Sequence, residues 1–187
     1  YDDHGNIIEK IDRRGKSWKY EYNTLGLITK MINPNGGEVI ATLNADGTLA
    51  GVKDSETGET TYTYDEFKRI ATITNADGTT KSFTYDLNDR PLTVTDENNH
   101  TYHYAYDPNG NLTQITDPAS HTFQYAYDLM DRISQYTDRR GMKTTYTYNE
   151  KGLTATIQDP NQVTTELKYD PRDWVNQITI ANKTWHL

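Results

Sequence analysis

Apolar and polar residues follow a pattern that repeats every 21 positions without a gap. Steps of 21 from the first residue reach Tyr in eight of nine cases, and Leu43 is the exception. The next residue is Asp or Asn in every repeat. A fixed period of this length is typical of stacked supersecondary units, so each repeat is expected to fold as one such unit. The tyrosines of this column are Tyr1, Tyr22, Tyr64, Tyr85, Tyr106, Tyr127, Tyr148 and Tyr169.

Two further apolar columns keep the same period. One column lies two positions before each repeat-opening residue, and its tyrosines are Tyr20, Tyr62, Tyr104, Tyr125 and Tyr146. The other fills the tenth position and runs from Met31 through Val52 and Ile73 to Ile178. In residues 61–65, Tyr alternates with Thr at period two. This alternation predicts a strand with the rings on one face and the threonines on the other.

Turn signals occur twice in each repeat. The first turn opens at the second position, for example at Asp65, Asp86, Asp107, Asp128 and Asp170, and the second turn opens at the twelfth position, again with Asp or Asn. These side chains accept backbone hydrogen bonds and a following Gly supplies positive φ, which are the requirements of tight turns. The predicted turn glycines are Gly5, Gly15, Gly78, Gly110 and Gly141.

Three residues depart from this turn pattern. Asp89 and Asp131 stand where other repeats have Gly, and Pro91 falls inside a strand segment. We expect these positions to produce turn variants or local bulges.

Two strands and two turns per repeat predict an all-β fold of tandem β-hairpins. Residues 1–187 then form a single array with repeats starting at 1, 22, 43, 64, 85, 106, 127, 148 and 169, the last one incomplete. Nine repeats give a continuous antiparallel ribbon of up to roughly 18 strands. Because twist accumulates between strands, the ribbon is expected to curve or spiral. Helical spacing does not persist beyond a turn, which argues against helices.

Composition alone favours the opposite conclusion. Leu, Ile, Val and Phe make up about 17% of the chain, and the net charge of −8 adds to a composition typical of disorder. However, 15 Tyr and 3 Trp supply large apolar surfaces. The periodic tyrosines are therefore expected to pack as a core, with stacking on a sugar or peptide ligand as the alternative.

Composition also excludes several classes of function. The absence of cysteine excludes disulfides, thiolate metal sites and a cysteine nucleophile. No apolar run is long enough to span a membrane, so no membrane insertion is expected. The pI near 5.0 argues against a nucleic-acid partner, because phosphate binding needs a surplus of basic residues. Since Tyr1 is not a native start, the chain is expected to be a piece of a larger protein.

Candidate chemistry is sparse. His100 and His121 occupy equivalent positions, and His103 lies near the first, so a metal site is conceivable. Equivalent positions lie about 10 Å apart, however, which favours structural or solvent-facing histidines. The Asp and Asn columns could bind calcium, although turn hydrogen bonding explains them more simply. We expect no catalytic residue, metal site or cofactor.

The repeated motifs resemble those of a known family. Residues 106–113, 115–118 and 122–128 resemble the YD repeat of the RHS family, and the likeness extends over the whole chain. The resemblance implies a β-ribbon that spirals into a hollow shell, which in toxin members encloses a C-terminal toxin. It also implies that the toxin is released by self-cleavage at a core segment in which Asp-Pro is followed by Gly-Leu. None of the Asp-Pro pairs in this chain is followed by that pattern.

The resemblance predicts a non-enzymatic structural module, a section of a partial RHS shell that encapsulates or scaffolds a secreted toxin. Its partners would be the rest of the shell and the enclosed toxin domain. Its expected location is secreted or on the surface of a bacterial cell, as part of a larger protein. The alternative is a cell-surface adhesion or recognition array that binds carbohydrate or protein.

Overall fold

The computed structural model describes residues 1–186 of the chain, and its regular elements in this range are 18 β-strands. The all-β prediction is therefore confirmed. None of the described elements is a helix that could cross a membrane. Contacts divide the chain into two compact units, Tyr1–His100 and Thr101–Leu187.

Each unit contains nine strands. The first unit holds β1 (Glu9–Ile11), β2 (Ser17–Tyr22), β3 (Ile28–Ile32), β4 (Glu38–Leu43), β5 (Leu49–Asp54), β6 (Gly58–Tyr64), β7 (Ile70–Thr74), β8 (Thr80–Tyr85) and β9 (Pro91–Thr95). The second unit holds β10 (Thr101–Tyr106), β11 (Leu112–Thr116), β12 (Thr122–Tyr127), β13 (Ile133–Thr137), β14 (Lys143–Tyr148), β15 (Thr154–Gln158), β16 (Thr164–Tyr169), β17 (Val175–Ile180) and β18 (Lys183–His186).

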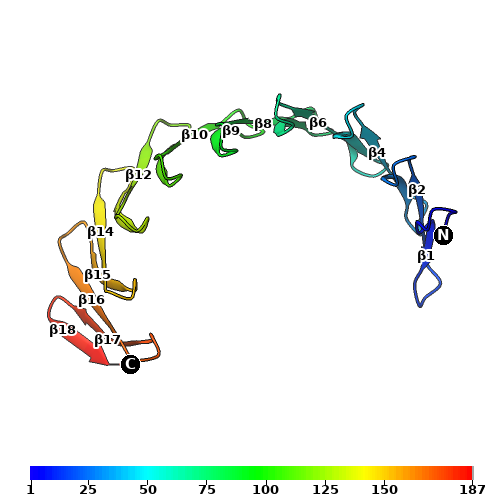
Figure 1. Cartoon of the computed structure of the whole chain (residues 1–187). Coiled ribbons are helices and arrows are strands. Elements are labelled where there is room, and N and C mark those ends of the chain that lie inside the picture. The colour runs from blue at the N-terminus through cyan, green and yellow to red at the C-terminus, as the bar shows by residue number, and fades with distance from the viewer. Residues whose placement is uncertain (187) are drawn as a thin grey trace. The chain divides into compact units, whose positions relative to one another are not determined.

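Within each unit every strand pairs antiparallel with the next strand along the chain. Figure 1 shows the resulting series of hairpins, each a single layer of strands. Tight turns permit this order, because antiparallel neighbours need only a short connection. The predicted tandem hairpins are confirmed, and the curved or spiralling course of the ribbon stays a prediction.

The two faces of the strands differ as the alternation predicts. In β6, Tyr62 and Tyr64 are half-buried whereas Thr61 and Thr63 are exposed. The two apolar columns lie directly opposite each other across neighbouring strands, as in the pair Tyr125 and Tyr136, whose ring centroids are 5.3 Å apart. Such cross-strand pairs are the main side-chain contribution to the stability of a sheet.

Threonines pair in the same way on the opposite face. The hydroxyl oxygens of Thr63 and Thr72 lie 2.6 Å apart, and those of Thr147 and Thr156 lie 2.7 Å apart. Each pair joins a first-turn hairpin, so this face is held together by hydrogen bonds in place of apolar contact.

The expected tyrosine core is wrong in one respect, because no hydrophobic side chain in residues 1–186 is fully buried. The accessible surface is 13075 Å². Two separate compact halves of this 21.5 kDa chain would expose roughly 11,000 Å². The physical reason is that a single strand layer lets the rings cover one another from the side and leaves their outer surface open.

The hairpin that contains Pro91 has the expected local bulge, but Pro91 does not interrupt the strand. It is the first residue of β9 and pairs with Tyr85. A proline is tolerated at this position because the first residue of a strand can lack an N–H donor.

Candidate functional site: the tyrosine and aspartate turn

The first turns are five-residue loops closed by one carboxylate or amide oxygen. In the turn at 128–132, the backbone N–H of Asp128 donates to the carbonyl of Arg132 (2.8 Å) and that of Asp131 donates to the carbonyl of Asp128 (3.1 Å). Asp128 Oδ1 accepts the N–H groups of Met130 (2.9 Å) and Arg132 (3.1 Å). The fourth residue, Asp131, has φ of 57°. The loop is thus an Asx turn whose fourth residue must tolerate the left-handed conformation.

The second turns use the same geometry. Asp117 Oδ1 accepts the N–H groups of Ala119 (2.9 Å) and His121 (2.8 Å), and Ser120 has φ of 65°. The structure places the predicted glycines at this fourth position, with φ of 83° at Gly5, 77° at Gly15, 82° at Gly78, 99° at Gly110 and 77° at Gly141. The turn after Asp54 differs, since its positive φ of 95° falls one residue later, at Gly58.

The four Asp-Pro pairs lie in these turns. In each pair the Asp opens the turn and the Pro follows as its second residue, at 107–108, 117–118, 159–160 and 170–171. The fixed φ of proline suits this position of a tight turn. The Asp-Pro pairs therefore serve the turns in this chain.

A β-bulge accompanies each first turn from 23–27 onward. Around the turn at 128–132, Ala126 pairs with Gln135 and Tyr127 pairs with Ile133, so Ser134 has no partner. The same register shift recurs in the other first-turn hairpins of both units. A bulge locally disrupts the ladder, which gives nearby backbone groups a need for other partners.

The repeat-opening tyrosines supply such a partner. Tyr127 donates its hydroxyl to the carbonyl of Leu112 (2.8 Å), the residue just before the bulge of the preceding repeat. The same bond, with an offset of 15 residues, joins Tyr22 to Ile7, Tyr64 to Leu49, Tyr85 to Ile70, Tyr148 to Ile133 and Tyr169 to Thr154. Each bond joins two repeats, which explains why this column is Tyr and not Phe.

Two positions of the column differ. Tyr1 is 82% exposed. Leu43 has no hydroxyl to offer the carbonyl of Ile28, the equivalent residue before the bulge at the first turn 23–27. Partial desolvation raises the pKa of Tyr85 and Tyr127, so these hydroxyls stay protonated and able to donate.

The turn carboxylates are held in their ionised form. The hydrogen bond from the Arg132 side chain is the largest cause of the lowered pKa of Asp128. For Asp170, the largest cause of the lowered pKa is the hydrogen bond from the backbone N–H of Trp174. The Thr48 hydroxyl, the Thr48 N–H and then Lys68 lower the pKa of Asp46 to about 2. Donors that bind the charged form of a carboxylate favour it, so these turns keep their acceptors at neutral pH.

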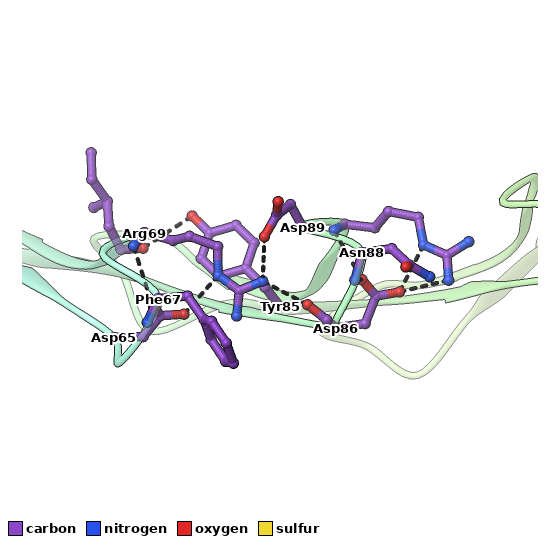
Figure 2. Close-up of polar contacts among 9 residues, drawn as sticks. Asp65, Phe67, Arg69, Tyr85, Asp86, Asn88 and Asp89 are labelled. Atoms are coloured by element: carbon purple, nitrogen blue, oxygen red, sulfur yellow. Dashed lines mark hydrogen bonds and ion pairs between the residues drawn. The ribbon is translucent and has the colours of Figure 1, made fainter.

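Arg69 joins two successive first turns, as Figure 2 shows. Its Nε donates to Asp65 Oδ2 (2.8 Å) in its own turn, and its Nη1 donates to the carbonyl of Asp86 (2.6 Å) and to Asp89 Oδ1 (2.8 Å) in the next. The guanidinium also lies over the Tyr85 ring, 4.7 Å from its centroid. The first turn at 65–69 is therefore coupled to the following repeat by an ion pair, a hydrogen bond and cation–π stacking, all made by Arg69.

Asp89 and Asp131 do not alter their turns, contrary to expectation. Both occupy the usual fourth position, with φ of 62° and 57°, and both turns keep the usual backbone bonds. Asp is among the few residues besides Gly that adopt this conformation readily. Its carboxylate is then free to contact the neighbouring turn, a role that the sequence alone did not reveal.

His100 and His121 lie in second turns. His100 Nδ1 is 3.3 Å from Asp96 Oδ2, and His121 Nδ1 is 3.0 Å from Asp117 Oδ2, each within its own turn. His103 lies on β10. Residues 1–186 contain no group of three or more His, Asp or Glu side chains arranged to hold a metal ion.

A comparison of the sequence with models of protein families finds a match over most of the chain. A family model described as RHS Repeat matches residues 1–38, 44–80, 85–122 and 106–144. The chain belongs to the RHS repeat family. Among curated proteins, none matches the chain.

Several solved structures are similar in part. Against a chain of TcdB2-TccC3-Cdc42, identity is 15% over 96% of this chain and 14% of the other, with a TM-score of 0.41. The Photorhabdus luminescens Tc holotoxin pore gives the same values. A porin-like protein from Bacteroides uniformis is 16% identical over 96% of this chain and 91% of its own, with a TM-score of 0.35. The RHS chain thus spans 14% of the length of these toxin-complex chains.

Proposed function

We propose that this RHS chain is a non-catalytic structural module, a section of wall in a larger shell that encloses or scaffolds a secreted toxin. One observation carries the proposal: the two residues that define the repeat are both used to build the sheet. Tyr127 bonds the preceding repeat, and Asp128 closes its own turn. A column of residues engaged in this way is architecture, because its polar atoms already have partners.

The two faces of the sheet also suit a wall. One face carries half-buried rings, such as Tyr125 and Tyr127, and the other carries paired threonines and glutamines. A one-layer sheet with an incompletely covered apolar face is suited to lie against further protein. The partners proposed for it are the remainder of the shell and an enclosed toxin domain, in a protein secreted by or displayed on a bacterial cell.

Limited proteolysis of the parent protein tests this proposal. Segments that follow the array in the parent should resist protease in the intact protein and become cleavable when Tyr127→Ala and Tyr148→Ala weaken the wall. The control is Tyr102→Ala, since Tyr102 is 37% exposed and lies outside the bonded column. Equal cleavage in the intact and weakened proteins would refute enclosure.

A recognition array is the second candidate, supported by exposed apolar side chains at the tips of first turns. Leu129, Met130 and Trp174 are each more than two-thirds exposed. Panels of immobilised glycans and surface proteins, probed with the 187-residue chain and with Leu129→Ser/Met130→Ser, would distinguish the two. Specific binding lost in the variant favours recognition, and protease protection without binding favours the wall.

A further inference from the structure

The first turns alternate between two chemistries along the second half of the chain. From residue 86 onward, the fourth residue of the turn is in order Asp89, Gly110, Asp131, Gly152 and Asp173. The three aspartates are thus 42 residues apart, twice the repeat length. A doubled period indicates that successive repeats are not equivalent.

Each of these aspartates accepts a bond from the first turn of the preceding repeat. Asp89 Oδ1 binds Arg69 Nη1 (2.8 Å), and Asp173 Oδ1 binds Lys151 Nζ (2.7 Å). Asp131 Oδ1 binds Asn109 Nδ2 (3.0 Å) and Asn111 Nδ2 (2.7 Å). The donors are a guanidinium, an ammonium and amides, whereas the acceptor position is constant. The recurring feature is therefore the position of the carboxylate.

Gly152 marks the same position without a carboxylate. A Cβ atom on Gly152 would lie 3.5 Å from Nη1 of Arg132, which belongs to the preceding first turn. Arg132 instead pairs with Asp128 in its own turn (2.7 Å) and lies over the Tyr148 ring (4.3 Å). Arg132 is therefore close enough to act as a donor, but Gly152 has no side chain to accept its hydrogen bond.

We propose that the carboxylates at the fourth position are latches that fasten successive repeats into pairs. In the second unit, the latches join the first turns 107–111 to 128–132 and 149–153 to 170–174. The joint between 128–132 and 149–153 has no latch at Gly152. The unit that opens cooperatively is then a 42-residue pair of repeats, and the weak joint lies across β13 and β14.

The second unit provides a matched comparison. The latched hairpins β11–β12 and β15–β16 and the unlatched hairpin β13–β14 each have three paired positions in the ladder. All three also have the tyrosine hydroxyl bond, from Tyr127, Tyr169 and Tyr148 respectively. In repeat arrays, stability is close to a sum of neighbour terms, so a difference at one interface becomes a difference in local opening.

Amide hydrogen exchange measured by NMR on the 187-residue chain tests the latches. Amides at the first-turn end of β13–β14 should exchange about twofold to fivefold faster than their equivalents in the two latched hairpins, as exposed ion pairs allow. Gly152→Asp should slow exchange in β13–β14 by a similar factor. Adding Arg132→Met should remove that gain, which a merely stiffer loop would not do.

A second variant tests the same latches by removal. Lys151→Met should raise exchange in β15–β16 to the level of β13–β14 and leave β11–β12 unchanged, and this result does not depend on whether Gly152→Asp folds. Equal exchange in all three wild-type hairpins, or no change in β15–β16 on losing Lys151, would overturn the proposal. Neither result would bear on the shell function, which rests on the tyrosine and aspartate columns.

Discussion

The first and second turns share one backbone geometry and differ in what they contact. Asp128 and Asp117 bind the same pair of backbone N–H groups in their own loops. The first turn adds a bulge, a tyrosine hydroxyl bond to the preceding repeat and side-chain bonds to neighbouring first turns. The acidic side chains of the second turns pair with groups in their own turn, as Asp117 does with His121. Coupling between repeats is thus concentrated at the edge with the tyrosines.

The same five residues, Asn-Ala-Asp-Gly-Thr, occur once in each kind of turn. Thr48 donates its hydroxyl to Asp46 (2.7 Å) in the first turn, and Thr79 donates to Asp77 (2.6 Å) in the second. Asp46 additionally pairs with Lys68 (3.2 Å) of the next first turn. Local sequence therefore determines the turn, and position in the repeat determines the coupling.

The largest expected effect is loss of a whole ring from the first-turn edge. Tyr127→Ala removes a half-buried ring together with its bond to Leu112. The free energy of unfolding in urea should fall by about 2 kcal/mol, less than the roughly 3–5 kcal/mol of a fully buried aromatic. A loss under about half a kcal/mol would show that the ring contributes little to the sheet.

Removing the hydroxyl alone should cost less. Tyr127→Phe keeps the ring and leaves the Leu112 carbonyl without its donor, so unfolding free energy should fall by about 1 kcal/mol. Tyr125→Phe is the matched control, because the Tyr125 ring pairs with Tyr136 by contact. If the two substitutions prove equally harmless, the hydroxyl bond has no energetic role.

Acid should weaken both kinds of turn. Hydrogen bonds lower the pKa of Asp46, Asp77 and Asp128 in the folded chain, so the unfolded chain binds more protons at acidic pH. Their stabilisation is complete above the unfolded pKa near 4 and is lost as pH falls through the folded pKa, about 2 for Asp46. Urea midpoints measured from pH 6 to 2 should decline below about pH 4.

Asp46→Asn and Asp77→Asn sharpen this comparison between the turns. Asp46→Asn also removes the ion pair with Lys68. The urea midpoint of this variant should therefore depend less on salt concentration than that of Asp77→Asn. If the urea midpoints of the two variants depend equally on salt, the contact between Asp46 and Lys68 does not stabilise the fold.

The smallest effect is expected at the second turn. His121→Ala removes a half-exposed side chain that binds Asp117 inside one loop, and the loop keeps its backbone bonds. Its urea unfolding curve should overlay that of the unmodified chain, because exposed pairs of this kind contribute little. A clear loss of stability would assign the second turn a role equal to that of the first.

Periodicity made most of the fold predictable, since Tyr, Asp and Gly columns specify strands and turns directly. It could not predict the bond from Tyr127 to Leu112, because the acceptor is a backbone carbonyl beside a bulge and any residue type can provide one. Asp131 looked like an imperfect turn residue because its partner, Asn111, lies 20 residues away. The solvent exposure of the tyrosine rings depends on how many layers pack together, and the pattern of residues along the chain does not predict that number.

Leu43 offers the most direct test of the claim that the tyrosine hydroxyl joins repeats. Leu43→Phe and Leu43→Tyr differ only by the hydroxyl, which the repeat geometry directs to the carbonyl of Ile28, 15 residues earlier. The Tyr variant should exceed the Phe variant in unfolding free energy by about 1 kcal/mol. Equal stability of the two variants would contradict the account.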